Sequence, residues 1–422
     1  MEKSSEKDLS KTLQTKPPDD VDIFPDGGLK AWTVVIGGWC LLFVSSGWIN
    51  CIGVFQTYYE QNQLKNYSPS TTAWILSLET FMMFANGAAV GKFYDNFGPF
   101  YVMLFGSILH VFGVMMMSLS SEYYQFILAQ GICSPLGASC LFYAAINAAS
   151  TWFKKRRALA LGIVVSGSSV GGVILPIFLQ RLFAKVGFAW SVRAAGFLML
   201  GLCVIAQVTV KSRLPPKPKP LNLVEFFRPL KEGPFLMITC GGFFFFWGMF
   251  VPFNYVIAEA QKIGMNAEVS SYLLAMLNGT SLFGRIFSGW LGDEFGRLNV
   301  TIFMSFLAGI LTLALWLPAK GSAPIIAYAI LYGFSSGAYI SLVPAVIAQI
   351  SPIQEIGVRS GSFFALTSLA TLTGNPIAGA ITTRQNGAFS GLQIFTGVIL
   401  IVGSTFFLLG RVLIVGFKPQ VV

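Results

Sequence analysis

The chain has 422 residues, of which 54% are hydrophobic and only 11% are charged. About a quarter of the residues of a soluble domain are charged, so this composition excludes a water-covered surface over most of the molecule and indicates a protein that lies in the lipid bilayer. The net charge of +10 is spread over short breaks between apolar runs rather than along one basic stripe, which argues against a nucleic-acid partner and is typical of topology signals.

In chain order, the sequence opens with a polar segment. Residues 1–31 are rich in lysine and aspartate, and they contain no short apolar run followed by a cleavage site. We therefore expect a disordered cytosolic tail here rather than a signal peptide.

Twelve apolar runs follow, each close to the length of about 20 residues that spans a membrane. The first six lie near residues 32–55, 71–91, 99–119, 124–150, 158–183 and 190–210. The second six lie near residues 234–258, 270–291, 298–317, 323–350, 358–382 and 391–416. The Pro- and Lys-rich stretch 211–233 is interpreted as a cytosolic linker, and residues 417–422 as a short cytosolic tail. We predict an all-α membrane protein of twelve transmembrane helices in two six-helix bundles, at 32–210 and 234–416.

The basic residues predict the orientation of these spans. Of the 28 Lys and Arg residues, 20 fall in the N-terminus, every second loop and the C-terminus, 7 fall in the opposite loops, and one lies within a span. Because basic residues are enriched in cytosolic loops, we expect both termini in the cytosol and a multi-pass protein of the cell membrane.

The two halves of the chain repeat each other. The pattern G-x-x-x-D-x-x-G occurs at Gly91–Gly98 and again, 198 residues later, at Gly289–Gly296. Further pairs keep nearly the same offset: Gly162 and Gly361, then Pro176 and Pro376. A constant offset through loops and spans indicates duplication. Two halves of six spans share one orientation, and such parallel halves place a substrate site between them near the membrane midplane.

The repeated loop predicts a gate. Its glycines permit a tight turn, and its carboxylate can cap the start of a helix. We expect Asp95 to meet the start of the eleventh span near Val358 and Arg359, and Asp293 to meet the start of the fifth near Arg156 and Arg157. Breaking these contacts would open the cytosolic side. The candidate gating residues are Asp95, Gly98, Asp293, Gly296, Arg156 and Arg157; the alternative is that the motif is only a turn signal.

Four features of the sequence carry a family resemblance. The repeated loop resembles that of the major facilitator superfamily. The stretches from Asp26 to Trp32 and from Trp152 to Gly171 are similar to signatures of the monocarboxylate transporter family, and the stretch from Gly47 to Tyr59 resembles its fungal branch. The resemblance covers nearly the whole chain. It implies the major facilitator fold and transport by alternating access, in a branch that includes plasma-membrane carriers, riboflavin-type carriers and exporters of secondary metabolites.

The chain departs from that family at two positions. Animal lactate carriers have a lysine in the first span where Asn50 stands here, and an aspartate one turn before the arginine that matches Arg285, where Ser281 stands here. These two groups couple lactate transport to protons in the family. Their absence leaves export of a metabolite and uptake of a monocarboxylate as open alternatives.

Two charged residues stand out within the predicted spans. Arg285 interrupts an apolar run, where a charge is expensive and usually faces a cavity or a partner, and a guanidinium suits a carboxylate. The alternative is a cation that reaches the cytosolic end of the span, or a structural ion pair. Glu79 is the only carboxylate that we place in the middle of a span, and it is the candidate for proton coupling; the alternative is a neutral Glu hydrogen-bonded to a neighbouring helix.

Several further polar and aromatic residues are candidates to line the substrate path, although helix packing explains each of them about as well. With Arg285, the candidate substrate-binding residues are Asn50, Tyr143, Asn147, Asn254, Asn278 and Tyr339. Aromatic residues among them favour a ring-bearing or amphipathic substrate over a very small one.

These observations favour a secondary transporter over an enzyme. No His, Asp or Glu cluster with catalytic or metal-ligand spacing is evident, and no cofactor or metal is expected. We predict a monomeric protein that moves a small organic acid or amphipathic metabolite. Efflux of a fungal secondary metabolite is the leading interpretation, and Glu79 is the candidate for proton coupling. The alternatives are a monocarboxylate or riboflavin-type uptake carrier and a membrane sensor that does not transport.

Overall fold

The computed structural model describes residues 24–216, 224–418 and 420–422, and in these ranges it contains helices and no strand. The first half comprises α2 (Leu29–Ile49), α3 (Ile52–Gln61), α4 (Pro69–Ala85), α5 (Gly87–Phe97), α6 (Pro99–Met117), α7 (Tyr123–Phe126), the π-helix η2 (Ile127–Cys133), α8 (Ser134–Ser150) and α9 (Arg157–Thr209). The second half comprises α11 (Gly233–Met249), α12 (Val251–Lys262), α13 (Ala267–Ser271), α14 (Leu273–Phe295), α15 (Arg297–Leu311), the π-helix η4 (Thr312–Trp316), α16 (Ser322–Gln349), the 3₁₀-helix η5 (Ile353–Glu355), α17 (Ile356–Arg384) and α18 (Ser390–Val415).

The helices account for the twelve expected spans. Ten helices of the described chain are long and apolar enough to cross a membrane. One of them, α9, has 53 residues and changes direction at Gly187, whose φ of 75° is favourable only for glycine, so it supplies two crossings. The 23-residue α14 is not among the ten, because Arg285, Asp293 and Glu294 make it more polar, and it supplies the twelfth.

The segments outside the spans differ from the expectation. The predicted disordered tail covered residues 1–31; residues 1–23 lie outside the described part, but Asp26 is anchored on the loop before α9 and α2 begins at Leu29. The linker contains two short helices, α10 (Val224–Phe227) and the 3₁₀-helix η3 (Arg228–Lys231). Val422, in the expected cytosolic tail, accepts a hydrogen bond from the N–H of Leu298.

The first and seventh spans are interrupted at equivalent positions of the repeat. The first breaks at Asn50, between α2 and α3, and the seventh breaks 200 residues later at Phe250, between α11 and α12. Pro252 explains the second break because proline lacks the N–H that continues a helix. At the first break the Asn50 amide donates to the carbonyls of Ser46 and Ser168, so the side chain ties the break to α9.

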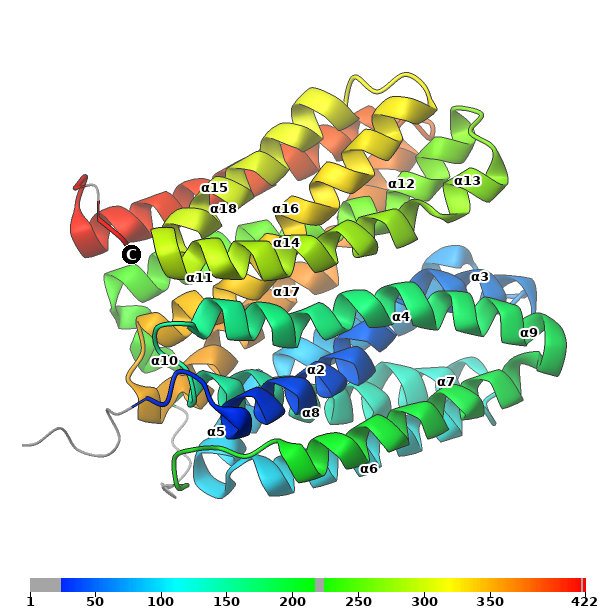
Figure 1. Cartoon of the computed structure of the whole chain (residues 1–422). Helices are drawn as coiled ribbons and strands as arrows, with labels where there is room; N and C mark the ends of the chain where they lie inside the picture. The colour runs from blue at the N-terminus through cyan, green and yellow to red at the C-terminus, as the bar shows by residue number, and fades with distance from the viewer. Residues whose placement is uncertain (1–23, 217–223, 419) are drawn as a thin grey trace, which may run out of the picture.

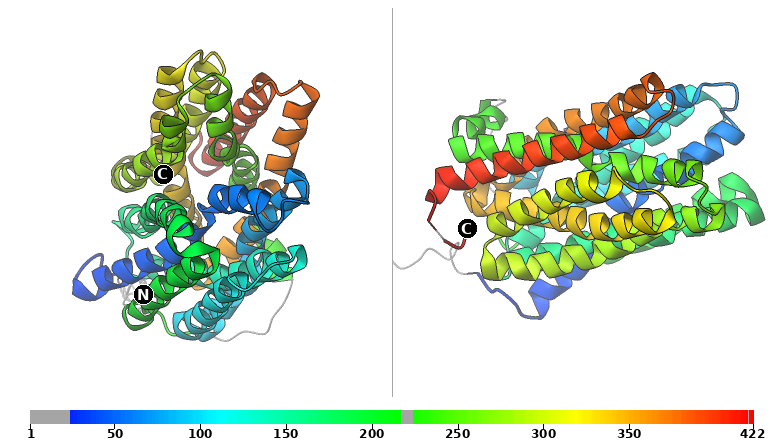
Figure 2. Two further views of the ribbon diagram at one scale, coloured as in Figure 1. Left: turned by 90° about the vertical axis from the view of Figure 1, so that its right-hand side faces the viewer. Right: turned by 90° about the horizontal axis from the view of Figure 1, so that it is seen from above.

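The helices form two groups that lie side by side, one from each half of the chain (Figure 1). Viewed along the helices, the blue-to-green first half and the green-to-red second half occupy separate regions (Figure 2, left). Both ends of the described chain lie at the same end of the molecule, together with α5 and α10 (Figure 1). We call this the loop end, because both repeated loops are located there.

The two halves approach each other most closely along two seams. One seam joins α9 to α14, and the other joins α4 and α5 to α17. A side chain on Gly91 would collide with the carbonyl of Gly357, and one on Gly289 would meet the carbonyl of Ala158 at 2.6 Å. These two glycines of the repeated loop motif therefore permit direct backbone contact between the halves.

Candidate substrate site

A cavity of about 50 Å³ lies between the two halves. Both halves contribute to its wall. The lining residues are Ser46, Ile49, Asn50, Phe84, Phe142, Val165, Ser168, Phe246, Met249, Phe250, Arg285, Ile340, Val343 and Phe364.

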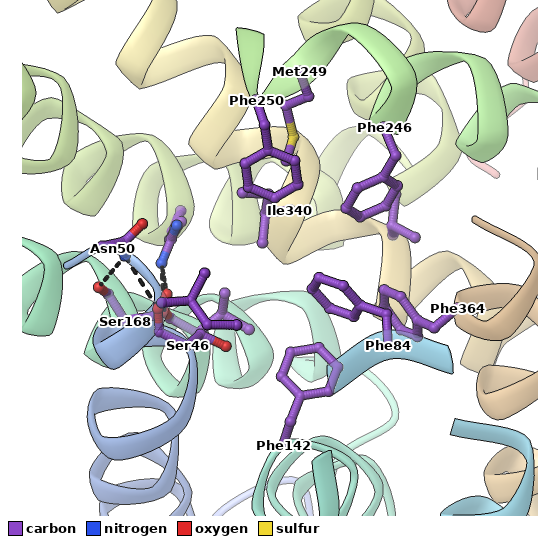
Figure 3. A pocket seen from close by; sticks show the side chains of 14 residues that line it. Ser46, Asn50, Phe84, Phe142, Ser168, Phe246, Met249, Phe250, Ile340 and Phe364 are labelled. Atoms are coloured by element: carbon purple, nitrogen blue, oxygen red, sulfur yellow. Dashed lines mark hydrogen bonds between the residues drawn. The ribbon is translucent and has the colours of Figure 1, made fainter. Parts of the chain in front are cut away.

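One side of the cavity is polar and positively charged. The Arg285 side chain, only 3% exposed, donates to the carbonyl of Val165 at 2.7 Å and to the Ser168 hydroxyl. Its Nε atom has no hydrogen-bond partner, and the ion pairs in the described part of the chain involve other cations. Asn50 lies beside Ser168 on the same side (Figure 3). The wall therefore presents a buried guanidinium without an acidic partner.

The opposite side of the cavity is a cluster of phenylalanine rings. The rings of Phe84 and Phe364 stack with centroids 5.7 Å apart, and Phe142 meets Phe364 edge-on at 5.4 Å. Phe246 packs against Phe84 at 5.8 Å. Figure 3 shows Phe84, Phe142 and Phe364 across the cavity from Asn50, Ser46 and Ser168. Because Phe84 and Phe142 come from the first half and Phe246 and Phe364 from the second, this aromatic wall spans both halves.

Of the seven residues predicted to bind substrate, Arg285 and Asn50 line this cavity. Three others are buried away from it. Tyr143 donates to the carbonyl of Phe84 at 3.0 Å, and Tyr339 packs on Phe245 with ring centroids 3.8 Å apart. Asn278 donates to the Leu274 carbonyl of its own helix. Polar character alone did not reveal which side of a helix faces the cavity.

The remaining two predicted residues differ from each other. The amide nitrogen and oxygen of Asn147 are buried and have no hydrogen-bond partner. Asn254 is exposed, one turn along α12 from Phe250 and away from the wall of this cavity.

At the loop end, both repeated aspartates contact the opposite half. Asp95 accepts a hydrogen bond from the N–H of Val358 at 3.1 Å. Asp293 accepts from the N–H groups of Ala158 and Leu159 at 3.0 and 2.8 Å, and it forms an ion pair with Arg297 at 2.9 Å. The contacts lie where the repeat predicts them, at the starts of α17 and α9.

The other predicted gate residues have distinct environments. Gly98 and Gly296 have φ of 74° and 97° and follow directly on the helices that carry the aspartates. Arg157 crosses between the halves by donating to the carbonyl of Ala348 at 3.0 Å. Arg156 is exposed, and its N–H lies 3.4 Å from Asp26 rather than on Asp293.

The sequence did not reveal the groups that support these contacts. Lys92, only 3% exposed, forms an ion pair with Glu225 of α10 at 2.6 Å, and Arg359 forms one with Glu232 at 2.6 Å. At the other seam, one Asp26 oxygen accepts from the N–H groups of Lys154 and Lys155 at 2.6 and 2.7 Å. These partners are more than a hundred residues apart, and no local pattern connects them.

Two carboxyl groups are buried within the helices, not one. Glu79 accepts a hydrogen bond from Gln130 at 2.9 Å, and Gln130 accepts one from Tyr59 at 2.5 Å. Glu259 accepts from Gln393 at 2.7 Å and from the indole N–H of Trp316. Glu79 was the only carboxylate placed in the middle of a span; Glu259, near the end of α12, was missed because the seventh span was ended at residue 258 and α12 continues to Lys262. Neither carboxyl lines the central cavity.

Comparison with known proteins gives a consistent result. A family model described as "Major Facilitator Superfamily" matches residues 38–331 and 238–419. The chain is 50% identical to "MFS-type transporter 1" of Ophiocordyceps sp. over 407 residues, which cover 96% of this chain and 91% of the relative. It is 46% identical to the "Fujikurins efflux protein" of Gibberella fujikuroi over 390 residues, covering 92% and 84%. The E. coli fucose:proton symporter FucP has a similar fold, with a TM-score of 0.71, 16% identity and coverage of 89% and 98%.

Proposed function

Because the chain belongs to the Major Facilitator Superfamily and is therefore a secondary transporter rather than an enzyme, we propose that it exports an anionic, ring-bearing secondary metabolite. The observation that carries the proposal is Arg285, a buried guanidinium that lines the cavity opposite a wall of phenylalanine rings and whose Nε has no hydrogen-bond partner.

The charge of Arg285 supports the anionic part of the proposal. Burying a charge without an opposite partner is costly, and removing a partner from a buried pair typically costs roughly 3–5 kcal/mol. Val165 and Ser168 supply acceptors but no negative charge. A substrate carboxylate or acidic enol would supply that charge and accept from the free Nε–H.

The aromatic wall supports the ring-bearing part. Offset and edge-on ring contacts contribute about 0.5–1.5 kcal/mol beyond the burial of their area. A substrate with its acid group at Arg285 and its rings toward Phe84 and Phe364 would contact both halves at once, as alternating access requires.

Export is supported by the relative whose name states fujikurin efflux.

The finer assignment to the monocarboxylate-transporter-like carriers rests on the stretches that begin at Asp26 and Trp152. Asp26 caps the loop at Lys154 and Lys155, so the two stretches form one structural unit. Uptake of a monocarboxylate would use the same cavity and remains the alternative for direction.

The cycle that we propose uses the loop end as the cytosolic gate, with both termini in the cytosol at the cell membrane. Asp95, Gly98, Asp293, Gly296, Arg156 and Arg157 form this gate, and opening separates α5 from α17 and α14 from α9. Glu79 is the proposed proton-coupling group, because its Gln130 partner is an amide and not a cation.

The test is counterflow of aromatic carboxylates in vesicles that contain the purified full chain. Arg285→Lys keeps the charge but loses the forked donor geometry, and we expect about a tenfold loss of counterflow for the best substrate found with the wild type. Arg181→Lys, at an exposed arginine of α9, is the matched control and keeps wild-type activity. Equal counterflow in Arg285→Lys and wild type would remove the assignment.

A further inference from the structure

We propose that Glu259, together with Gln393 and Trp316, forms a second proton-binding site, located in the half of the protein opposite Glu79. The three residues come from three separate elements, α12, α18 and the π-helix η4. The site is distinct from the central cavity and does not depend on the ligand of Arg285.

The geometry assigns a role to each oxygen of Glu259, which is 6% exposed. Oε2 accepts from the indole N–H of Trp316, and an indole nitrogen can only donate. Oε1 accepts from the amide Nε2 of Gln393 at 2.7 Å, and the same nitrogen donates to the Trp316 carbonyl at 3.2 Å. A proton can therefore bind at Oε1 without displacing the indole.

The charges around the site leave the carboxylate without a counter-ion. Lys262, one turn along α12, donates instead to the Gly387 carbonyl at 2.7 Å. Tyr255 of α12 donates to the Asn375 carbonyl, and Tyr328 of α16 shares a hydrogen bond with Thr312. Glu268 on α13 and Arg384 at the end of α17 form no ion pair with Glu259 within the described chain. A buried, unpaired carboxylate is costly, and binding a proton removes its charge.

The Gln393 amide can form a hydrogen bond with Glu259 whether the carboxyl group is ionised or protonated. Its nitrogen donates to the carboxylate, and after rotation of the amide its oxygen can accept from the carboxylic acid. This rotation breaks the Gln393 contact with the Trp316 carbonyl, so proton binding at Oε1 would release one anchor of η4. π-Helical segments occur frequently at functional sites. In η4, proton binding at Glu259 would change a hydrogen bond to Trp316, the last residue of the π-helix.

The same chemistry occurs once in each half. Glu79 is bonded to Gln130, which lies on the π-helix η2, and Glu259 is bonded to Gln393 beside the π-helix η4. The sites are not copies, because the offset of 200 at the first and seventh spans places Tyr59 opposite Glu259, and the offset of 198 at the repeated loop places Leu277 opposite Glu79. Two Glu–Gln pairs that do not descend from one position of the repeat indicate a functional requirement rather than a relic of duplication.

The second site also connects to the cavity wall. The Trp316 ring stacks on Tyr328 at 4.9 Å, and Tyr328 lies 5.1 Å from Tyr332. The Tyr332 hydroxyl donates to the carbonyl of Met249 at 2.9 Å, and Met249 lines the cavity. A change at η4 can therefore be transmitted to the wall through packed side chains.

The experiment follows the proton itself, by infrared difference spectroscopy of the full chain in lipid nanodiscs across a pH titration. The wild type should show two carbonyl bands of buried carboxylic acids that titrate. Glu259→Gln should remove one band and Glu79→Gln the other. Glu60→Gln, at an only half-buried position of α3, should retain both. A wild-type spectrum in Glu259→Gln, or the absence of any titrating acid band, would overturn the proposal.

A second variant guards against misfolding. Gln393→Leu keeps the carboxyl group of Glu259. This variant should shift the pH midpoint of the Glu259 band and leave the Glu79 band in place. An unmoved midpoint would contradict the role of the amide. Arg285→Lys should leave both bands unchanged, so failure of the proposed substrate site and failure of the proton site give different results.

Discussion

The two seams of the proposed gate lie at the two copies of one repeated loop, yet they are held together differently. Asp293 is bonded to two backbone N–H groups across the interface and to the guanidinium of Arg297. Asp95 accepts one backbone N–H, from Val358, and none of the ion pairs in the described chain includes it. The position equivalent to Arg297 at an offset of 198 is Pro99.

Two carboxylates from the segment between the halves support the Asp95 seam, which has fewer contacts of its own. Glu225 and Glu232, from the segment between the halves, bind Lys92 on α5 and Arg359 on α17. The comparison teaches that duplication preserved the position of the proposed gate contacts but not the number of groups that hold each aspartate. The Asp293 seam carries its own cation, whereas the Asp95 seam depends on the linker.

The gate can be followed by labelling a cysteine placed at Ser360, which is 1% exposed in this closed arrangement, in a background whose native cysteines are replaced by alanine. Asp293→Asn should have the largest effect. It weakens two backbone contacts and leaves Arg297 without its acid, a loss of about 2–4 kcal/mol. We expect maleimide labelling at position 360 to accelerate more than tenfold. The adjacent exposed Glu294→Gln is the matched control and should label at the wild-type rate.

Asp95→Asn should have a smaller effect on the same labelling rate. It weakens a single charge-assisted contact to a backbone N–H, worth about 1 kcal/mol, and should accelerate labelling about fivefold. If Asp95→Asn accelerated labelling as much as Asp293→Asn, the proposed difference between the seams would be wrong.

Pro99→Arg tests the comparison in the opposite direction, because it places a cation at the position equivalent to Arg297. An ion pair of this kind contributes up to about 1 kcal/mol, so labelling should slow about threefold. The effect should disappear in the double variant with Asp95→Asn. Slowing that persists without Asp95 would show that the arginine acts through another group.

Glu225→Gln should have the smallest effect. Its carboxylate is partly exposed, and such ion pairs contribute roughly 0.2–1 kcal/mol. We expect about a twofold acceleration of labelling at low ionic strength that vanishes in 1 M salt, where charges are screened within roughly 3 Å. An acceleration that is independent of salt would assign α10 a packing role instead.

Much of this architecture could be predicted from the sequence, because long apolar runs and a repeat of constant offset are strong signals. The contacts of Asp95 and Asp293 followed from the same repeat. The cavity wall could not be predicted in full, since the chain has 39 phenylalanines and hydrophobicity does not distinguish a ring that faces lipid from one that faces the cavity. Tyr143 and Tyr339 look like path residues but bury their rings among helices, and Glu259 was missed because one helix extends four residues further than its apolar run.

The interruptions at Asn50 and Phe250 have a mechanical consequence. Each divides a span into a long arm, α2 or α11, packed within its bundle, and a short arm, α3 or α12, that continues toward the mouth opposite the loop end. A broken backbone ladder bends more easily than an intact helix. The short arms can therefore bend relative to the long arms, which stay packed in their bundles.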